Sequence, residues 1–177
     1  MKKLILIPVL VTLLLSFDAF SQKIPHMTQI DKQELRYMDN SYISILAWQE
    51  YMYYTKEKYG QGSKEYLSII PNIEEFNKHY NGKYSIVKIK DTYTFNPEKG
   101  FNKKRENFPI VGLSISQKEG YCKWRTEVFN YKVAKKHKVV FSLPTAKDYE
   151  KAIKLKKIKN IEENNEASFR CMATIVK

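Results

Sequence analysis

The sequence predicts an α+β domain, because two capping boxes each open a helix and a short apolar strand lies between those helices, all within residues 108–152. A capping box pairs a hydroxyl side chain at the helix N-cap with a polar side chain three residues later, so it marks where a helix begins. An apolar run precedes the first box. The expected order is therefore strand, turn, helix, loop, strand, helix, and we expect the rest of the domain to be built around this segment.

The first of these helices is predicted to begin at Ser114. The apolar run that starts at Phe108 breaks at Gly112, and Ser114 is followed three residues later by Gln117. Beyond this box, aromatic and apolar side chains recur at helical spacing, at Tyr121, Trp124, Val128 and Tyr131. We expect this face to pack on the sheet and to bury Trp124 in the core.

The strand and the second helix follow directly. Residues 139–143 are apolar, and the strand ends before Pro144 because proline cannot donate a ladder hydrogen bond. Thr145 with Asp148 forms the second capping box, which predicts the helix that closes this segment at about Ala152.

The N-terminal residues 1–21 are predicted to be a secretory signal peptide. Lys2 and Lys3 precede an apolar stretch at residues 4–15, whose length of about a dozen residues suits a signal peptide and is too short to span a bilayer. Ala19-Phe20-Ser21 places small residues where signal peptidase reads, so we expect cleavage before Gln22. The competing interpretation is a buried N-terminal helix. Residues 22–177 then form a single exported domain, in the periplasm or at the outer membrane, with no transmembrane span after cleavage.

The chain is strongly basic, with 31 Lys and Arg against 19 Asp and Glu and a formal net charge of +12. Most of this charge comes from lysine, whereas nucleic-acid recognition depends on arginine forks, and the chain shows no basic arm. We therefore expect no nucleic-acid partner. The charge is explained by solvated lysine-rich faces, or by an anionic partner such as a membrane surface, an acidic glycan or another protein.

Local signals also place elements ahead of residue 108. A short strand is expected at residues 35–38. Ser44 can cap a helix from Ile45 to about Tyr59, where Gly60 ends it, with an apolar stripe that includes Trp48.

The remaining segments are assigned more coarsely. Residues 61–83 are expected to form one or two short helices, and residues 84–90 an exposed strand, followed by a surface loop over 91–107. After the acidic turn at Glu162-Glu163, residues 167–176 are expected to form a closing core strand.

Four blocks of the sequence resemble the formylglycine-generating-enzyme, or sulfatase-modifying-factor, family. They are Pro109-Ile110-Val111-Gly112-Leu113-Ser114 with Tyr121-Cys122-Lys123-Trp124, then Leu143-Pro144-Thr145-Ala146-Lys147-Asp148-Tyr149-Glu150-Lys151-Ala152, then Phe169-Arg170-Cys171, and, more weakly, Tyr37-Met38-Asp39 on to Tyr51. The resemblance covers most of the chain after the leader. It implies a reduced domain of the C-type-lectin-like fold, with helices packed on a small, mostly antiparallel sheet.

The same resemblance implies that this chain is a pseudoenzyme. Catalytic members bind copper with a pair of nearby cysteines, but the two cysteines here, Cys122 and Cys171, match positions outside that pair. The family's central segment, with its metal-binding loops, has no counterpart in the short interval 153–168. The resemblance suggests instead a structural disulfide between Cys122 and Cys171, and no cofactor or metal.

The residues themselves, without the resemblance, also favour a disulfide and give no sign of a metal or catalytic site. An even number of cysteines in an oxidising compartment usually pairs, although a reactive or metal-binding pair is the competing interpretation. His26, His79 and His137 are scattered without metal-ligand spacing. Ser114 and Ser116 are explained by capping, and the acidic pairs Glu74-Glu75 and Glu162-Glu163 by solvated turns.

Two functions remain in view, besides an active oxidase that the cysteine count contradicts. The first is a non-catalytic structural or binding component of a cell-envelope assembly, similar to proteins of gliding motility and type IX secretion, with other envelope proteins as partners. The second is a small lectin-like module that binds a glycan or peptide, for which Tyr51, Tyr53 and Tyr54 are the candidate contacts.

Overall fold

The computed structural model describes residues 24–98, 108–132, 137–156, 158 and 168–176, and these residues form an α+β domain as predicted. The predicted signal peptide, the acidic turn at 162–163 and the first residue of the predicted closing strand lie outside the described residues. The elements are β1 (Met27–Asp31), β2 (Arg36–Asp39), α1 (Ile45–Tyr59), α2 (Lys64–Ser68), α3 (Ile73–Tyr80), β3 (Tyr84–Ile89), β4 (Thr92–Pro97), α4 (Ile115–Lys132), β5 (Lys138–Ser142), α5 (Ala146–Leu155) and β6 (Met172–Val176).

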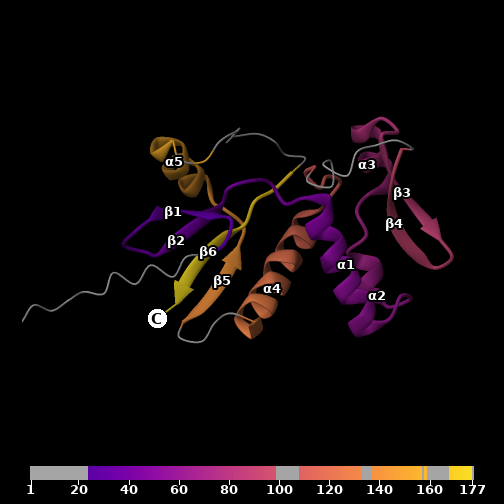
Figure 1. Cartoon of the computed structure of the whole chain (residues 1–177), viewed down its shortest axis with the longest axis horizontal. Helices are drawn as coiled ribbons and strands as arrows, with labels where there is room; N and C mark the ends of the chain where they lie inside the picture. The colour runs from indigo at the N-terminus through magenta and orange to yellow at the C-terminus, as the bar shows by residue number, and fades with distance from the viewer. Residues whose placement is uncertain (1–23, 99–107, 133–136, 157, 159–167, 177) are drawn as a thin grey trace, which may run out of the picture.

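The strands form two small antiparallel sheets. The larger sheet has the order β1-β2-β6-β5, so that the last strand of the chain lies between two earlier ones. The hairpin β3–β4 forms the second sheet. In Figure 1 the larger sheet lies at one end and the hairpin at the other, with α4 and α1 between them.

The capping signals located the helix starts correctly. Ser44 accepts a hydrogen bond from the backbone of Ala47 and begins α1, which ends before Gly60 at a positive φ of 92°. The Ser114 hydroxyl accepts from Gln117 N, and the Gln117 side chain accepts from Ser114 N at 2.8 Å, which is the predicted capping box of α4. Both arms of the box at Thr145 and Asp148 are also present.

Three strand predictions need correction. Residues 92–97, predicted as part of a surface loop, form β4, which pairs along the whole of β3. The strand predicted around Phe108 is only a single bridge between Ser44 and Pro109. The strand at 84–90 is not simply exposed, because Tyr84 and Ile86 are buried in the core.

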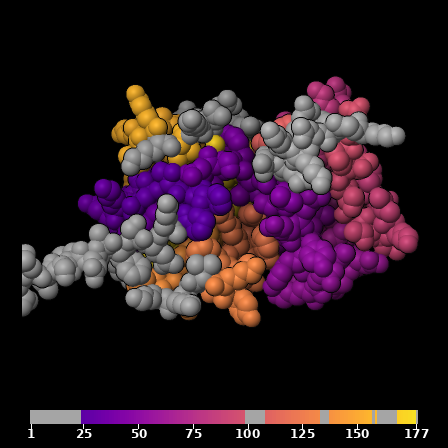
Figure 2. All heavy atoms as spheres, viewed as in Figure 1, coloured from indigo at the N-terminus to yellow at the C-terminus, as the bar shows by residue number. Residues whose placement is uncertain are grey.

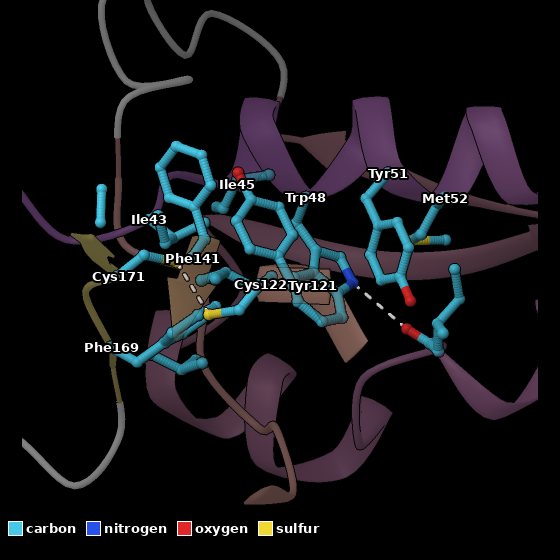
Figure 3. Packing of buried hydrophobic residues seen from close by; sticks show 14 of the residues in the cluster. Ile43, Ile45, Trp48, Tyr51, Met52, Tyr121, Cys122, Phe141, Phe169 and Cys171 are labelled. Carbon is cyan, nitrogen blue, oxygen red and sulfur yellow. Dashed lines mark hydrogen bonds between the residues drawn. The ribbon is translucent and has the colours of Figure 1, made fainter. Parts of the chain in front are cut away.

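The core is centred on Trp48, which is fully buried (Figure 3). Its indole stacks on Tyr121 of α4, with ring centroids 5.5 Å apart, and meets the edge of Phe169. The indole N–H donates to the carbonyl of Ile69 at 3.2 Å. The ring is therefore packed in the core, and its buried N–H group has a hydrogen-bond partner. Trp48 therefore joins α1, α4, the segment before β6 and the segment after α2.

The predicted stripe on α4 faces α1 rather than the sheet. Trp124 is half-buried and packs on Tyr51 and Tyr54, while Tyr131 is 91% exposed. The face of α4 that meets the sheet carries Phe129, whose ring packs on Phe141 of β5. The stripe passes from the core to the surface because α1 and α4 separate toward their C-terminal ends (Figure 1).

Candidate functional site

Two of the sequence blocks, those that contain Asp39 and Arg170-Cys171, meet at a partly buried ion pair between β2 and α4. Arg125 binds Asp39 through two parallel hydrogen bonds of 2.7 and 2.9 Å. Cys171 N donates to Asp39 Oδ2 at 2.8 Å, and Arg170 Nη1 donates to the Asp39 carbonyl at 2.9 Å. Burial opposes the charge on Arg125, but the charge and hydrogen bonds of Asp39 raise the pKa of its guanidinium. This arrangement uses both charges to hold three segments of the chain together.

The two cysteines lie beside this ion pair in the core. Cys122 is on α4 and Cys171 directly precedes β6, and their sulfur atoms lie 3.0 Å apart as free thiols (Figure 3). Burial, together with the neighbouring Cys122 and Asp39, raises the pKa of the Cys171 thiol well above its ordinary value. A thiol in this setting is a poor nucleophile, because the thiolate is the reactive form. The disulfide between these residues stays a prediction.

The other residues that the resemblance singled out also have structural positions. Gly112 adopts a positive φ of 73°, and a Cβ there would lie 2.9 Å from the carbonyl oxygen of Asn72, so only glycine fits. Leu143 packs against the core, and Phe169 is buried within it. Pro144 leads into the capping box, where Thr145 donates to the buried Asp148, which also binds Arg36 of β2 at 2.8 Å.

The tyrosines proposed as ligand contacts divide between the core and the surface. Tyr51 is buried against Trp48 and Tyr121, so its ring belongs to the core. Tyr53 and Tyr54 are 63% and 37% exposed, on the part of α1 that diverges from α4.

A hollow of about 850 Å³ opens between the diverging helices. We call it the α1–α4 groove; its lining residues are Gln49, Glu50, Tyr53 and Tyr54 from α1 and Trp124, Glu127, Val128, Tyr131 and Lys132 from α4. Figure 2 shows the atoms of α4 beside those of α1 and α2 on one face of the molecule. The volume of the groove falls in the range of small-molecule binding sites.

Sequence reasoning identified only part of this groove. It named Tyr53 and Tyr54, but it assigned Trp124, Val128 and Tyr131 to the core. The sequence did contain a signal that part of this face is exposed. Glu127 lies within the aromatic face of α4, and a charged residue is rarely buried without a partner.

Comparison with protein-family models, with curated proteins and with solved structures gave no match. Within the described part of the chain, no helix has both the length and the apolar composition needed to cross a membrane. Among the same residues, no group of three or more His, Cys, Asp or Glu side chains is placed to share a metal ion.

Proposed function

We propose that this protein is an exported, non-catalytic binding component of a cell-envelope assembly, built on a reduced domain of the sulfatase-modifying-factor type. We further propose that the α1–α4 groove is the surface that contacts its partner. The observation that carries the proposal is the exposure of Tyr53, Tyr54 and Tyr131 around half-buried Trp124 in a single hollow.

Exposed aromatic residues gathered in one place favour binding over a purely structural role. Tyr and Trp bury a large area with few rotatable bonds, and they dominate the energetics of protein interfaces. Isolated exposed apolar residues are ordinary, but a cluster that lines a hollow is typical of an interaction site. The loss of catalysis is supported by the burial of both cysteines in the core next to the Asp39–Arg125 ion pair.

The alternative is a lectin-like module that uses the same groove. Tyrosine faces can stack on sugar rings, and the side chains of Gln49 and Glu50 can hydrogen-bond to sugar hydroxyls. The groove combines these two residue types, so a neutral glycan is the second candidate ligand.

Site-specific photo-crosslinking in the native cells tests the binding role. Benzoylphenylalanine is placed at Tyr53 or Tyr131 in the groove, and at Leu67 as a control, because Leu67 is 48% exposed on α2 and does not line the groove. We expect one discrete adduct from each groove position, identified by mass spectrometry as an envelope protein, and none from Leu67. Equal adducts at all three positions, or no adduct in the groove, would contradict the proposal.

A further inference from the structure

We propose that the α1–α4 groove selects a basic peptide segment and seats a lysine or arginine side chain between its carboxylates and its tyrosine rings. This inference rests on the proposed function, because it requires that the groove is a binding surface. It adds the chemical class of the partner.

The described lining of the groove carries more negative than positive charge although the whole chain is basic. Glu50 of α1 and Glu127 of α4 line it from opposite sides, and Lys132 is the one cation in that lining. Lys56 and Lys58 lie beside the lining, over the rings of Tyr53 and Tyr54. On a chain with a formal net charge of +12, two carboxylates in one hollow offer a local site for a cationic group.

These two carboxylates also have no ion-pair partner among the described residues. Other exposed glutamates, such as Glu65 and Glu74, share this property, but Glu50 and Glu127 are the ones that line the groove. Several other acidic residues on the surface are paired. Glu34 pairs with Arg36, Glu57 with Lys56, Asp91 with Lys88 and Asp31 with Lys151. Glu50 and Glu127 are both exposed and enter no ion pair with a described residue. Lys58 is near enough to Glu127 for that charge to contribute to the raised pKa of Lys58, although a hydrogen bond with Tyr59 is the main cause. Because neither carboxylate is held in an ion pair with a described residue, both can meet a cation from outside.

The tyrosine rings supply the second half of a cation site. An ammonium or guanidinium group is attracted to the face of an aromatic ring within about 6 Å of its centroid. The chain itself shows this affinity, with Lys56 5.3 Å from the ring centre of Tyr53 and Lys58 5.6 Å from that of Tyr54. Tyr131, 91% exposed, has no ring or cation contact with a described residue, so its faces are open to a ligand.

Other partners fit this combination less well. An anionic membrane surface or acidic glycan would be repelled by Glu50 and Glu127 at the groove, whatever the charge of the whole chain. A neutral glycan would leave two carboxylates without a charged partner. An extended basic segment satisfies both features, because its charged group can meet the carboxylates while its methylene stem packs on the rings.

The test is a selection of random twelve-residue peptides on the purified exported protein. Peptides that also bind the double variant Tyr53→Ser/Tyr131→Ser are removed, which leaves those that depend on the groove. Both substituted residues are exposed, so the variant should fold normally. We expect the remaining peptides to be enriched in Lys and Arg.

The best peptide is then measured quantitatively. Replacing its lysine by norleucine, which keeps the stem and removes the charge, should weaken binding at least tenfold, as should citrulline in place of arginine. Glu127→Gln should weaken binding several-fold. Glu74→Gln makes the same change in net charge on α3, where Glu74 is exposed, enters no ion pair with a described residue and does not line the groove, so it should leave binding unchanged.

The outcomes separate this inference from the proposed function. Groove-dependent peptides that lack basic residues, or equal binding of the norleucine analogue, would overturn the inference and leave the groove as a binding surface. Groove-dependent binding of a neutral glycan on an array would overturn it in favour of the lectin-like alternative. If neither peptides nor glycans depend on Tyr53 and Tyr131, both the inference and the proposed function fail.

Discussion

At the scale of single residues, the two tryptophans have different roles. Trp48 is fully buried and donates its indole N–H to Ile69, whereas Trp124 is half-buried at the rim of the groove. The indole nitrogen of Trp124 is itself inaccessible and has no hydrogen-bond partner among the described residues. Trp124 thus contributes less to the stability of the fold than Trp48 does, which agrees with a position at a binding surface.

This difference predicts unequal effects of truncation. Trp48→Ala should lower the free energy of unfolding by about 3–5 kcal/mol, because it leaves a large cavity in the core. Trp124→Ala should cost roughly 1–2 kcal/mol, because part of that side chain is already in water. Urea denaturation of both variants measures the difference. If Trp124→Ala is as damaging as Trp48→Ala, Trp124 is a core residue and the sequence-based expectation was right.

Asp31 predicts an acid-dependent loss of stability. Its carboxylate accepts backbone hydrogen bonds from Glu34 and Gln33 and binds Lys151, and the first of these, followed by the lysine, lowers its pKa from 3.8 to about 2. Because the pKa is lower in the folded state, the contribution is present above pH 3.8 and is lost as the pH falls toward 2. Urea midpoints measured from pH 5 to pH 2 should fall less steeply for Asp31→Asn than for the parent protein. Identical slopes would show that Asp31 is not paired in solution.

At the scale of elements, α4 covers the edge of the larger sheet that β5 forms. The Asn130 side chain accepts from Val139 N at 2.9 Å and donates to Val139 O at 2.8 Å, so it replaces a missing neighbouring strand. Thr126 Oγ1 accepts from Phe141 N at 2.9 Å. An uncovered edge strand can pair with a strand of another chain. Here the side chains of α4 hydrogen-bond to the backbone groups that such a strand would use.

Removing this cover should have two effects. Asn130→Ala loses two hydrogen bonds, so we expect a loss of about 1–3 kcal/mol in the free energy of unfolding, with an increased tendency to self-associate. Denaturation and sedimentation measure the two effects. Lys123→Ala, on an exposed position of the same helix, is the control and should change neither.

The elements also show what the sequence could and could not predict. The starts of α1, α4 and α5 were predictable because each depends on a capping side chain within three or four residues. The strand β4 was missed because the turn before it, Lys90-Asp91, lacks the usual Asn-Gly signal, even though Lys90 adopts a positive φ of 50°.

The direction in which the α4 stripe points was also beyond the sequence. Helical spacing shows which residues share a face, but not which neighbour that face meets. The same limit explains the groove. Tyr53 and Tyr54 could be named from α1 alone, but their juxtaposition with Glu127 and Tyr131 depends on how two helices distant in sequence separate.

At the scale of the whole molecule, residues distant in sequence converge on one ion pair. Asp39 comes from the weakest of the resembling blocks, and it binds Arg125 and the backbone of Cys171. This convergence gives the weak block a structural reason to be present.

The pseudoenzyme proposal has a direct chemical test. The purified protein is incubated with copper, oxygen and a peptide that carries the sulfatase motif, and the peptide is weighed. We expect its cysteine to be unchanged, because Cys122 and Cys171 are both buried and are committed to the core. Formation of the aldehyde would contradict the proposal, and an active member of the enzyme family serves as the positive control.

The last prediction rests on the proposed export and concerns how the strand β6 is held. The sulfur atoms of Cys122 and Cys171 lie 3.0 Å apart in the core, and in an oxidising compartment we expect them to form a disulfide. The bond would tie α4 to the segment that enters β6, the strand between β2 and β5. By the chain-entropy estimate, closing a loop of about 50 residues stabilises the fold by roughly 4 kcal/mol, and the mechanism of that effect is model-dependent.

Protein purified from the envelope, unfolded and alkylated without reductant, should therefore gain no mass. After reduction it should gain two alkyl groups and unfold at a lower urea concentration. Two groups added before reduction would show that the thiols stay free, and the Asp39–Arg125 ion pair would then hold β6 in place without covalent help.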